Sequence, residues 1–222
     1  MSELQPIRKS GEGFPTDEAF YLEHVSKRTL PEALTPLRHT LDWPVDMTSL
    51  RAHISCFFGQ PNYSASKDKD PHFALDIQVP EGTCVATPET ATFVYKDAQT
   101  YINRHRGLAD VLLYSQESGL AYWLVHLDLD SLHPTIAQRH WFDRYSEERF
   151  QRGERIGQVG LFFKGEAGGL HPSVEIPPKV EETYERSYNH VHFEIHYQPD
   201  FHRLGTDINN SIDPLALLKR LY

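Results

Sequence analysis

The sequence has little cysteine and no long apolar segment, and each absence excludes a class of protein. Its 222 residues include only two cysteines, Cys56 and Cys84, each in an apolar, strand-like stretch. Two isolated cysteines exclude a disulfide-rich scaffold and a cysteine-based zinc module, so we expect two small buried side chains, with a disulfide as the less favoured alternative. No run reaches the roughly twenty apolar residues of a transmembrane helix, so we expect no membrane span.

Basic residues are also few, at 22 Lys and Arg against 31 Asp and Glu, which gives a formal net charge of −9. An acidic chain gains nothing from counterion release on a phosphate backbone, which argues against nucleic acid as the main partner. The first twenty residues contain no apolar core of the kind found in secretory signal peptides, so we expect no such signal there. The cellular location is left open by the sequence.

What the chain does contain, from Leu41 onward, is a series of short segments rich in Val, Ile, Phe and Tyr, separated by Gly and Pro. No alternation of strand and helix patterns is visible, so we predict an all-β fold built mainly of antiparallel sheet. The expected strands lie near residues 52–58, 74–79, 83–86, 91–95, 110–115, 121–127, 156–160 and 190–197.

The remaining segments define the domain organisation. Residues 1–40 are predicted to form a polar N-terminal extension with short helical stretches at Thr16–Val25 and Pro31–Leu37, and residues 41–222 a single domain. Residues 131–152 predict a helical insertion. Residues 164–189, rich in Gly, Pro and Glu, predict a long loop.

At the end of the chain, Asp213 followed by Pro214 is typical of the cap and first residue of a helix, so we expect a short closing helix there.

Histidine is abundant, with 13 residues, and the most informative ones lie in the segment 190–197. Strict alternation in a strand places one set of side chains on one face and an apolar set on the other. The polar set is His190, His192, Glu194 and His196, and the apolar set is Val191, Phe193, Ile195 and Tyr197. Two imidazoles one pleat apart, backed by an apolar face, indicate a metal site.

Two further segments add candidate side chains. His72 and Asp76 would lie about 13 Å apart in an extended strand, so they share a site only if the chain bends between them. His126 lies in a strand-like run, with Trp123, Val125 and Leu127 assigned to the opposite face. Taken alone, such a histidine is more typical of a hydrogen-bonded core residue.

Together these segments supply imidazoles and a carboxylate but no thiolate. Hydrolytic zinc sites use three nitrogen or oxygen ligands and keep a fourth position for water. Further imidazoles nearby can accept a proton from that water or stabilise an oxyanion. The residue types therefore favour metal-dependent hydrolysis of an amide bond.

The order of these motifs resembles that of the lysostaphin/LytM-type zinc metallopeptidases, which are peptidoglycan endopeptidases. The resemblance covers about residues 41–220 and includes the segments around the histidines. These segments are Leu41-Asp42-Trp43-Pro44-Val45, Ile54-Ser55-Cys56-Phe57-Phe58-Gly59, Asp76-Ile77-Gln78-Val79-Pro80-Glu81-Gly82-Thr83 with Ala86, and Gly153-Glu154-Arg155-Ile156-Gly157-Gln158-Val159-Gly160.

The resemblance implies a role for five residues. His72, Asp76 and His192 would be the zinc ligands, and His190 and His126 the catalytic histidines. It also implies a small antiparallel β domain of the duplicated-hybrid-motif kind, with a groove across one sheet. The partners would be stem peptides or cross-bridges of peptidoglycan.

The chain also departs from the family pattern. Ala74 stands where the family usually has glycine between the histidine and the aspartate. The segments 131–152 and 164–189 are long for the family, so we expect them to alter substrate choice.

One alternative is a non-haem Fe(II) oxygenase. His126 and Asp128 form a His-x-Asp motif, and His190 or His192 would complete a site with two histidines and one carboxylate. That interpretation leaves His72 and the flanking motifs without a role. Under it, Asp128→Ala abolishes metal binding.

A second alternative is a non-hydrolytic or latent family member that acts as a binding or regulatory module, with residues 1–40 folded across the groove. Other histidines are assigned no main role. His196 would lie about 13 Å beyond His192 and be peripheral. His140 is expected in the inserted helix, and His171 in the long loop.

Overall fold

The computed structural model describes most of the predicted domain. The described residues are 30–48, 52–56, 58, 72–98, 108–138, 148–160, 189–199 and 210–221. The expected helix at Thr16–Val25, almost all of the expected loop, His140 and His171 lie outside them. Within the described parts, no helix has the length and apolar character that crossing a membrane requires.

A large antiparallel sheet dominates the structure, which confirms the predicted all-β class. Its strand order is β1-β2-β9-β6-β5-β4-β7, with β10 paired to β9, and β3 and β8 form a separate two-stranded sheet. The strands are β1 His53–Cys56, β2 Leu75–Gln78, β3 Cys84–Ala86, β4 Ala91–Ala98, β5 Leu108–Ser115, β6 Leu120–Asp128, β7 Arg149–Phe150, β8 Arg155–Gln158, β9 His190–Tyr197 and β10 Ser211–Ile212. Each of the eight expected strands is among them.

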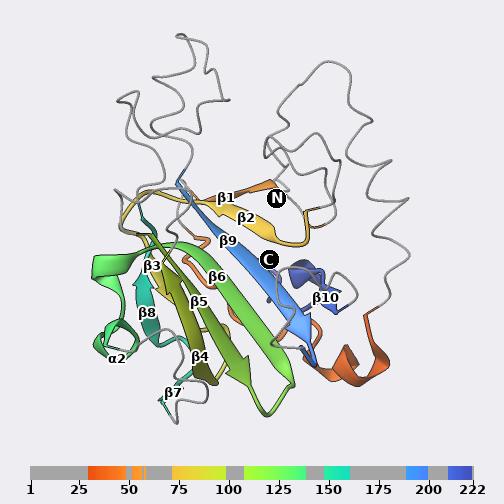
Figure 1. Cartoon of the computed structure of the whole chain (residues 1–222). Coiled ribbons are helices and arrows are strands. Elements are labelled where there is room, and N and C mark those ends of the chain that lie inside the picture. Colours follow the sequence, from red (N-terminus) through yellow and green to blue (C-terminus); the bar gives the residue numbers. More distant parts are fainter. Residues whose placement is uncertain are drawn as a thin grey trace.

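Strand β9 lies inside the sheet, between β2 and β6 (Figure 1). The alternation predicted for it is present, because Val191, Phe193 and Ile195 have no exposed surface and belong to the main hydrophobic core. Burying each such side chain contributes about 1.5–3 kcal/mol, so this apolar set holds the register of β9. The polar side chains of the strand are thereby directed to the opposite face of the sheet.

The helices are short. They are η1 Glu32–Leu37, η2 Leu129–Ser131, α2 Pro134–Ala137 and η3 Pro214–Ala216. The predicted cap of the closing turn is present, because the Asp213 carboxylate accepts a hydrogen bond from the Leu215 amide at 3.0 Å. Leu34 of η1 is 1% exposed and belongs to the main core, so the segment 30–40 packs against the β domain.

Two expectations are wrong in detail. The segment 131–152 is not helical throughout, because among its described residues 131–138 form short helical turns whereas Arg149–Phe150 pairs with β4 as a strand. Phe150 is 2% exposed, so burying this ring against the core favours the strand. Cys84 is exposed and free rather than buried, since it lies on a strand of the small sheet with its side chain outward. The side chain of Cys56 lies outside the described part of the chain.

Candidate metal centre

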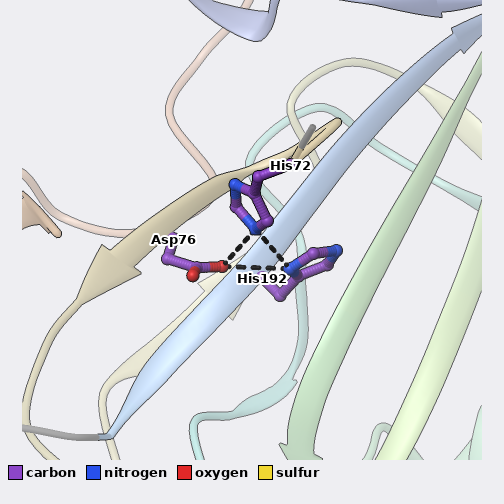
Figure 2. Close-up of side chains that lie close together, drawn as sticks. All are labelled: His72, Asp76 and His192. Carbon is purple, nitrogen blue, oxygen red and sulfur yellow. Dashed lines mark hydrogen bonds and ion pairs between the residues drawn. The ribbon is translucent and has the colours of Figure 1, made fainter. Parts of the chain in front are cut away.

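Three of the predicted site residues meet on the polar face of β2 and β9 (Figure 2). His72 Nε2 lies 3.1 Å from His192 Nδ1 and 3.2 Å from Asp76 Oδ1, and His192 Nδ1 lies 2.9 Å from the same carboxylate oxygen. Their three potential ligand atoms lie within 4.8 Å of one another, and no other such group occurs among the described residues.

Two local features bring these side chains together. Asp76 and His192 are directly opposite each other in the antiparallel pairing of β2 with β9, so their side chains share a face. His72 precedes β2, and the chain bends at Ala74 before the strand begins. This bend removes the separation of about 13 Å that an extended strand would impose.

The two remaining predicted site residues lie beside this group. His190 Nε2 is 3.7 Å from Asp76 Oδ1. The His126 ring stands at 76° to the His190 ring, with 4.7 Å between their centroids, and lies 6.3 Å from that of His192. The structure therefore brings all five sequence-predicted residues into one cluster, in which two imidazoles adjoin the group of three.

A β-bulge in β6 places His126 on this face of the sheet. The side-chain directions predicted from regular alternation are therefore wrong for this part of β6. Between the pairs Ala109–Leu127 and Val111–Leu124, two residues of β6 oppose one residue of β5. His126 adopts φ 70°, which is uncommon for a residue with a side chain. Regular alternation would have placed His126 in the core.

The sequence pattern predicted that Trp123 and Val125 lie on the face opposite His126. In the structure they lie on the same face as the histidine cluster. They pair with Glu194 and His192 of β9 and share their face. Leu127 belongs to the main core, as expected.

The backbone of His126 is held in place by Gly160. The Gly160 amide donates a 2.9 Å hydrogen bond to the His126 carbonyl. A Cβ atom on Gly160 would lie 2.3 Å from Leu108 Cδ2 and 3.1 Å from the Asp128 amide nitrogen. Because residue 160 is glycine, its backbone can lie close to Leu108 and Asp128, and this contact positions the bulge.

We expect Gly160→Ala to lower the free energy of unfolding by about 1–3 kcal/mol, because the added methyl group overpacks this contact. It should also displace His126 from the cluster. Thermal unfolding measures the first effect, and the NMR resonances of the His126 ring measure the second. Gly153→Ala is an informative comparison, because Gly153 has positive φ but no atom within 4 Å of an added Cβ. An unchanged His126 resonance in Gly160→Ala would contradict this coupling.

Electrostatics distinguish the residues of the cluster. Burial alone would raise the pKa of Asp76, but the charge of His190 and hydrogen bonds from His192 and His72 hold it well below its ordinary value. Burial and the neighbouring charges of His190 and His192 lower the pKa of His126 well below its ordinary value. At neutral pH the cluster thus contains an ionised carboxylate and a neutral His126.

His192 is held between two carboxylates. Its Nδ1 faces Asp76, and its Nε2 lies 2.8 Å from Glu194 Oε1. Burial opposes the charge on the ring, but hydrogen bonds to both carboxylates raise the pKa of His192 to about 10. Glu194 was assigned no role from the sequence, although the alternation of β9 had placed it on the histidine face.

The oxygenase alternative requires Asp128 as a metal ligand, but in the structure this residue caps a helical turn. Its side chain accepts a hydrogen bond from the Asp130 amide at 3.1 Å and caps η2. Asp128 belongs to no cluster of three potential ligands within the described ranges.

The donor set of His72, Asp76 and His192 fits a small divalent metal. Zinc binds imidazole nitrogen and carboxylate oxygen at about 2.0–2.2 Å, so tetrahedral ligand atoms lie about 3.3–3.5 Å apart. The three observed separations, 3.1, 3.2 and 2.9 Å, are shorter by a few tenths of an ångström. Small outward movements of the side chains would accommodate the ion.

No protein-family model and no curated protein matches the chain. Its fold does match 23 chains of solved structures. A zinc-containing peptidase from Vibrio cholerae matches with a TM-score of 0.48 and 14% identity, over 82% of this chain and 41% of that one. Csd3 from Helicobacter pylori matches with a TM-score of 0.47 and 14% identity, over 81% of this chain and 35% of that one.

The catalytic domain of the antimicrobial peptidase lysostaphin from Staphylococcus simulans matches with a TM-score of 0.42 and 14% identity, over 73% of this chain and 89% of that domain. This chain thus spans less than half the length of the Vibrio and Helicobacter proteins. At 14% identity, the similarity to these three proteins is one of fold alone.

Proposed function

We propose that this chain is a zinc metalloendopeptidase that hydrolyses peptide cross-links of bacterial peptidoglycan. The observation that carries the proposal is the group of His72, Asp76 and His192 with the His126–His190 pair beside it. Three ligands with two adjacent imidazoles supply what hydrolysis of an amide requires, namely a metal position, a proton acceptor and a hydrogen-bond donor.

In this proposal His72, Asp76 and His192 hold the zinc ion. When bound, zinc lowers the pKa of a coordinated water to about 7 and polarises the scissile carbonyl. His190 Nε2 lies 3.7 Å from Asp76 Oδ1, beside the proposed metal position, so we assign it the role of accepting the proton from water. His126 is kept neutral by its surroundings and is assigned to donate a hydrogen bond to the developing oxyanion.

The substrate class is supported by the sequence motifs, whose order resembles that of peptidoglycan endopeptidases. The test is mass spectrometry of muropeptides released from purified sacculi by three samples of the protein. These are the zinc-loaded protein, the chelator-treated protein, and the treated protein with zinc restored. Release that needs zinc supports the proposal and identifies the bond. Zinc binding without release from sacculi would leave a latent or regulatory protein and refute the proposed activity.

Zinc binding is expected to release a proton from His192. In the metal-free protein this side chain is protonated at neutral pH, because its pKa is raised to about 10, and a metal ligand must give up the proton. The apparent zinc affinity should therefore rise by about tenfold per pH unit between pH 6 and 8. Calorimetry in buffers of different ionisation enthalpy measures the released protons. An affinity independent of pH would contradict the assignment.

His126→Gly is expected to separate function from stability. Loss of one oxyanion donor should lower kcat by about 10²–10³-fold. Glycine should also relieve the positive φ at this position, so the variant should be about 1 kcal/mol more stable than His126→Ala. Thermal unfolding of both variants together with their kcat values provides the check. Full activity in either variant would exclude His126 from catalysis.

A further inference from the structure

Behind the candidate metal centre, three side chains of β9 form a continuous chain of hydrogen bonds. His192 Nε2 lies 2.8 Å from Glu194 Oε1, and Glu194 Oε2 lies 2.7 Å from His196 Nε2. We call His192, Glu194 and His196 the β9 triad. On the side away from Glu194, His196 Nδ1 lies 3.5 Å from Ser211 Oγ of β10, which is in register with His196.

Exposure falls along the triad with distance from the centre. The exposed fraction of the side chain is 21% for His192, 13% for Glu194 and 2% for His196. A carboxylate in such surroundings is stable only when its oxygens are hydrogen-bonded, and each oxygen of Glu194 faces one imidazole nitrogen. His196 therefore holds the carboxylate in place, although it does not reach the metal centre itself.

The triad determines which nitrogen of His192 faces the metal position. Both ring nitrogens of His192 face a carboxylate, Nδ1 that of Asp76 and Nε2 that of Glu194, so both donate in the metal-free protein. A ligating imidazole is neutral, with one N–H donor and one acceptor nitrogen. Because the Glu194 carboxylate only accepts hydrogen bonds, the proton that remains when a metal ion binds stays on Nε2, and Nδ1, which also faces His72, is the ligand atom. His72 presents its Nε2 atom to the same position.

We propose that Glu194, held by His196, is a positioning residue that keeps the Nε2 proton and the ring orientation of His192 and so strengthens metal binding at Nδ1. This inference rests on the proposed zinc centre. Loss of outer partners of this kind typically weakens metal binding by about 10–100-fold. It assigns a function to His196, which the sequence pattern alone had left peripheral.

The experiment compares zinc affinity in wild type, Glu194→Ala, Glu194→Gln, His196→Gln and the double variant Glu194→Ala/His196→Gln. A chromophoric chelator competes for zinc at several pH values, so that a changed proton affinity of His192 is separated from the affinity for zinc. In the zinc-loaded proteins, NMR follows the slowly exchanging Nε2 proton of His192. Glu81→Gln, at an exposed turn position, is the control for loss of one negative charge.

We expect Glu194→Ala to weaken zinc binding by about 10–100-fold and to lose the protected Nε2 proton resonance. Glu194→Gln, which retains an acceptor oxygen, should lose less. His196→Gln should weaken binding in the wild-type background but have no further effect once Glu194 is alanine, because it acts through the carboxylate. Glu81→Gln should bind zinc as wild type does.

Wild-type zinc affinity in folded Glu194→Ala would overturn the inference. If that variant does not fold, wild-type affinity and a retained Nε2 resonance in both Glu194→Gln and His196→Gln would overturn it equally. Absence of zinc binding by the wild-type protein would instead refute the metal centre, and the inference with it, before any variant is compared. Neither readout depends on which peptide bond the protein cuts.

Discussion

Replacing Asp76 with asparagine is expected to abolish zinc binding and the proposed peptidase activity while leaving the sheet intact. The Asp76 Oδ1 atom is the common neighbour of three imidazole nitrogens, at 3.2 Å from His72, 2.9 Å from His192 and 3.7 Å from His190. Asparagine retains the shape but removes the charge that binds the cation and attracts these rings. The loss of affinity should be well beyond the roughly 10–100-fold that removal of an outer partner causes.

The measurement is the zinc dissociation constant from chelator competition, together with the metal content of the purified protein. Asp128→Ala is the matched control, because that carboxylate is close to His126 in sequence but caps η2 instead of facing the cluster. We expect it to bind zinc as wild type does. Metal loss in Asp128→Ala but not in Asp76→Asn would reverse the assignment and favour the oxygenase alternative, whose ligands include Asp128.

Much of the sheet was predictable from the sequence because each of its longer strands has a local signature. In β9 the apolar residues alternate without interruption, so the side on which His190 and His192 lie can be deduced from the burial of Val191, Phe193 and Ile195. By contrast, β7 and β10 have two residues each, too few for alternation to be recognised. Their pairing depends on the neighbouring strands and not on a pattern of their own.

The candidate site was predictable to a similar degree. The five proposed site residues were found from spacing and motif order, but the face of β6 was assigned wrongly around His126. A period of two assumes an unbroken ladder, whereas a bulge adds one residue and reverses the facing of the residues beyond it. Such a bulge depends on close packing between segments distant in sequence, here Gly160 against Leu108 and Asp128.

The role of Glu194 was not predictable for a related reason. Alternation places it on the histidine face, but which of its neighbours it bonds depends on side-chain rotamers and on β10 behind His196. Motif spacing therefore identifies candidate ligands better than it identifies the residues that orient them.

The second large effect is expected for His190→Ala, which should lower kcat/KM on a purified cross-linked muropeptide by about 10²–10⁴-fold. Its Nε2 atom lies near Asp76 but outside the group of three potential ligands, so zinc affinity should be retained. The combination of bound zinc with lost turnover separates a proton-transfer residue from a metal ligand. Stoichiometric zinc in the inactive variant, measured on the same preparation as the kinetics, is the required observation.

His133→Ala is the control for removing a histidine from this domain. His133 caps α2 through a 3.4 Å contact from the Thr135 amide and packs edge-on against Phe150, outside the cluster. It should change stability more than turnover, because a lost cap costs about 0.5–2 kcal/mol. If His190→Ala retained wild-type kcat/KM with zinc bound, proton transfer would have to be assigned to another group, and His126, whose ring lies 4.7 Å from that of His190, would be the next candidate.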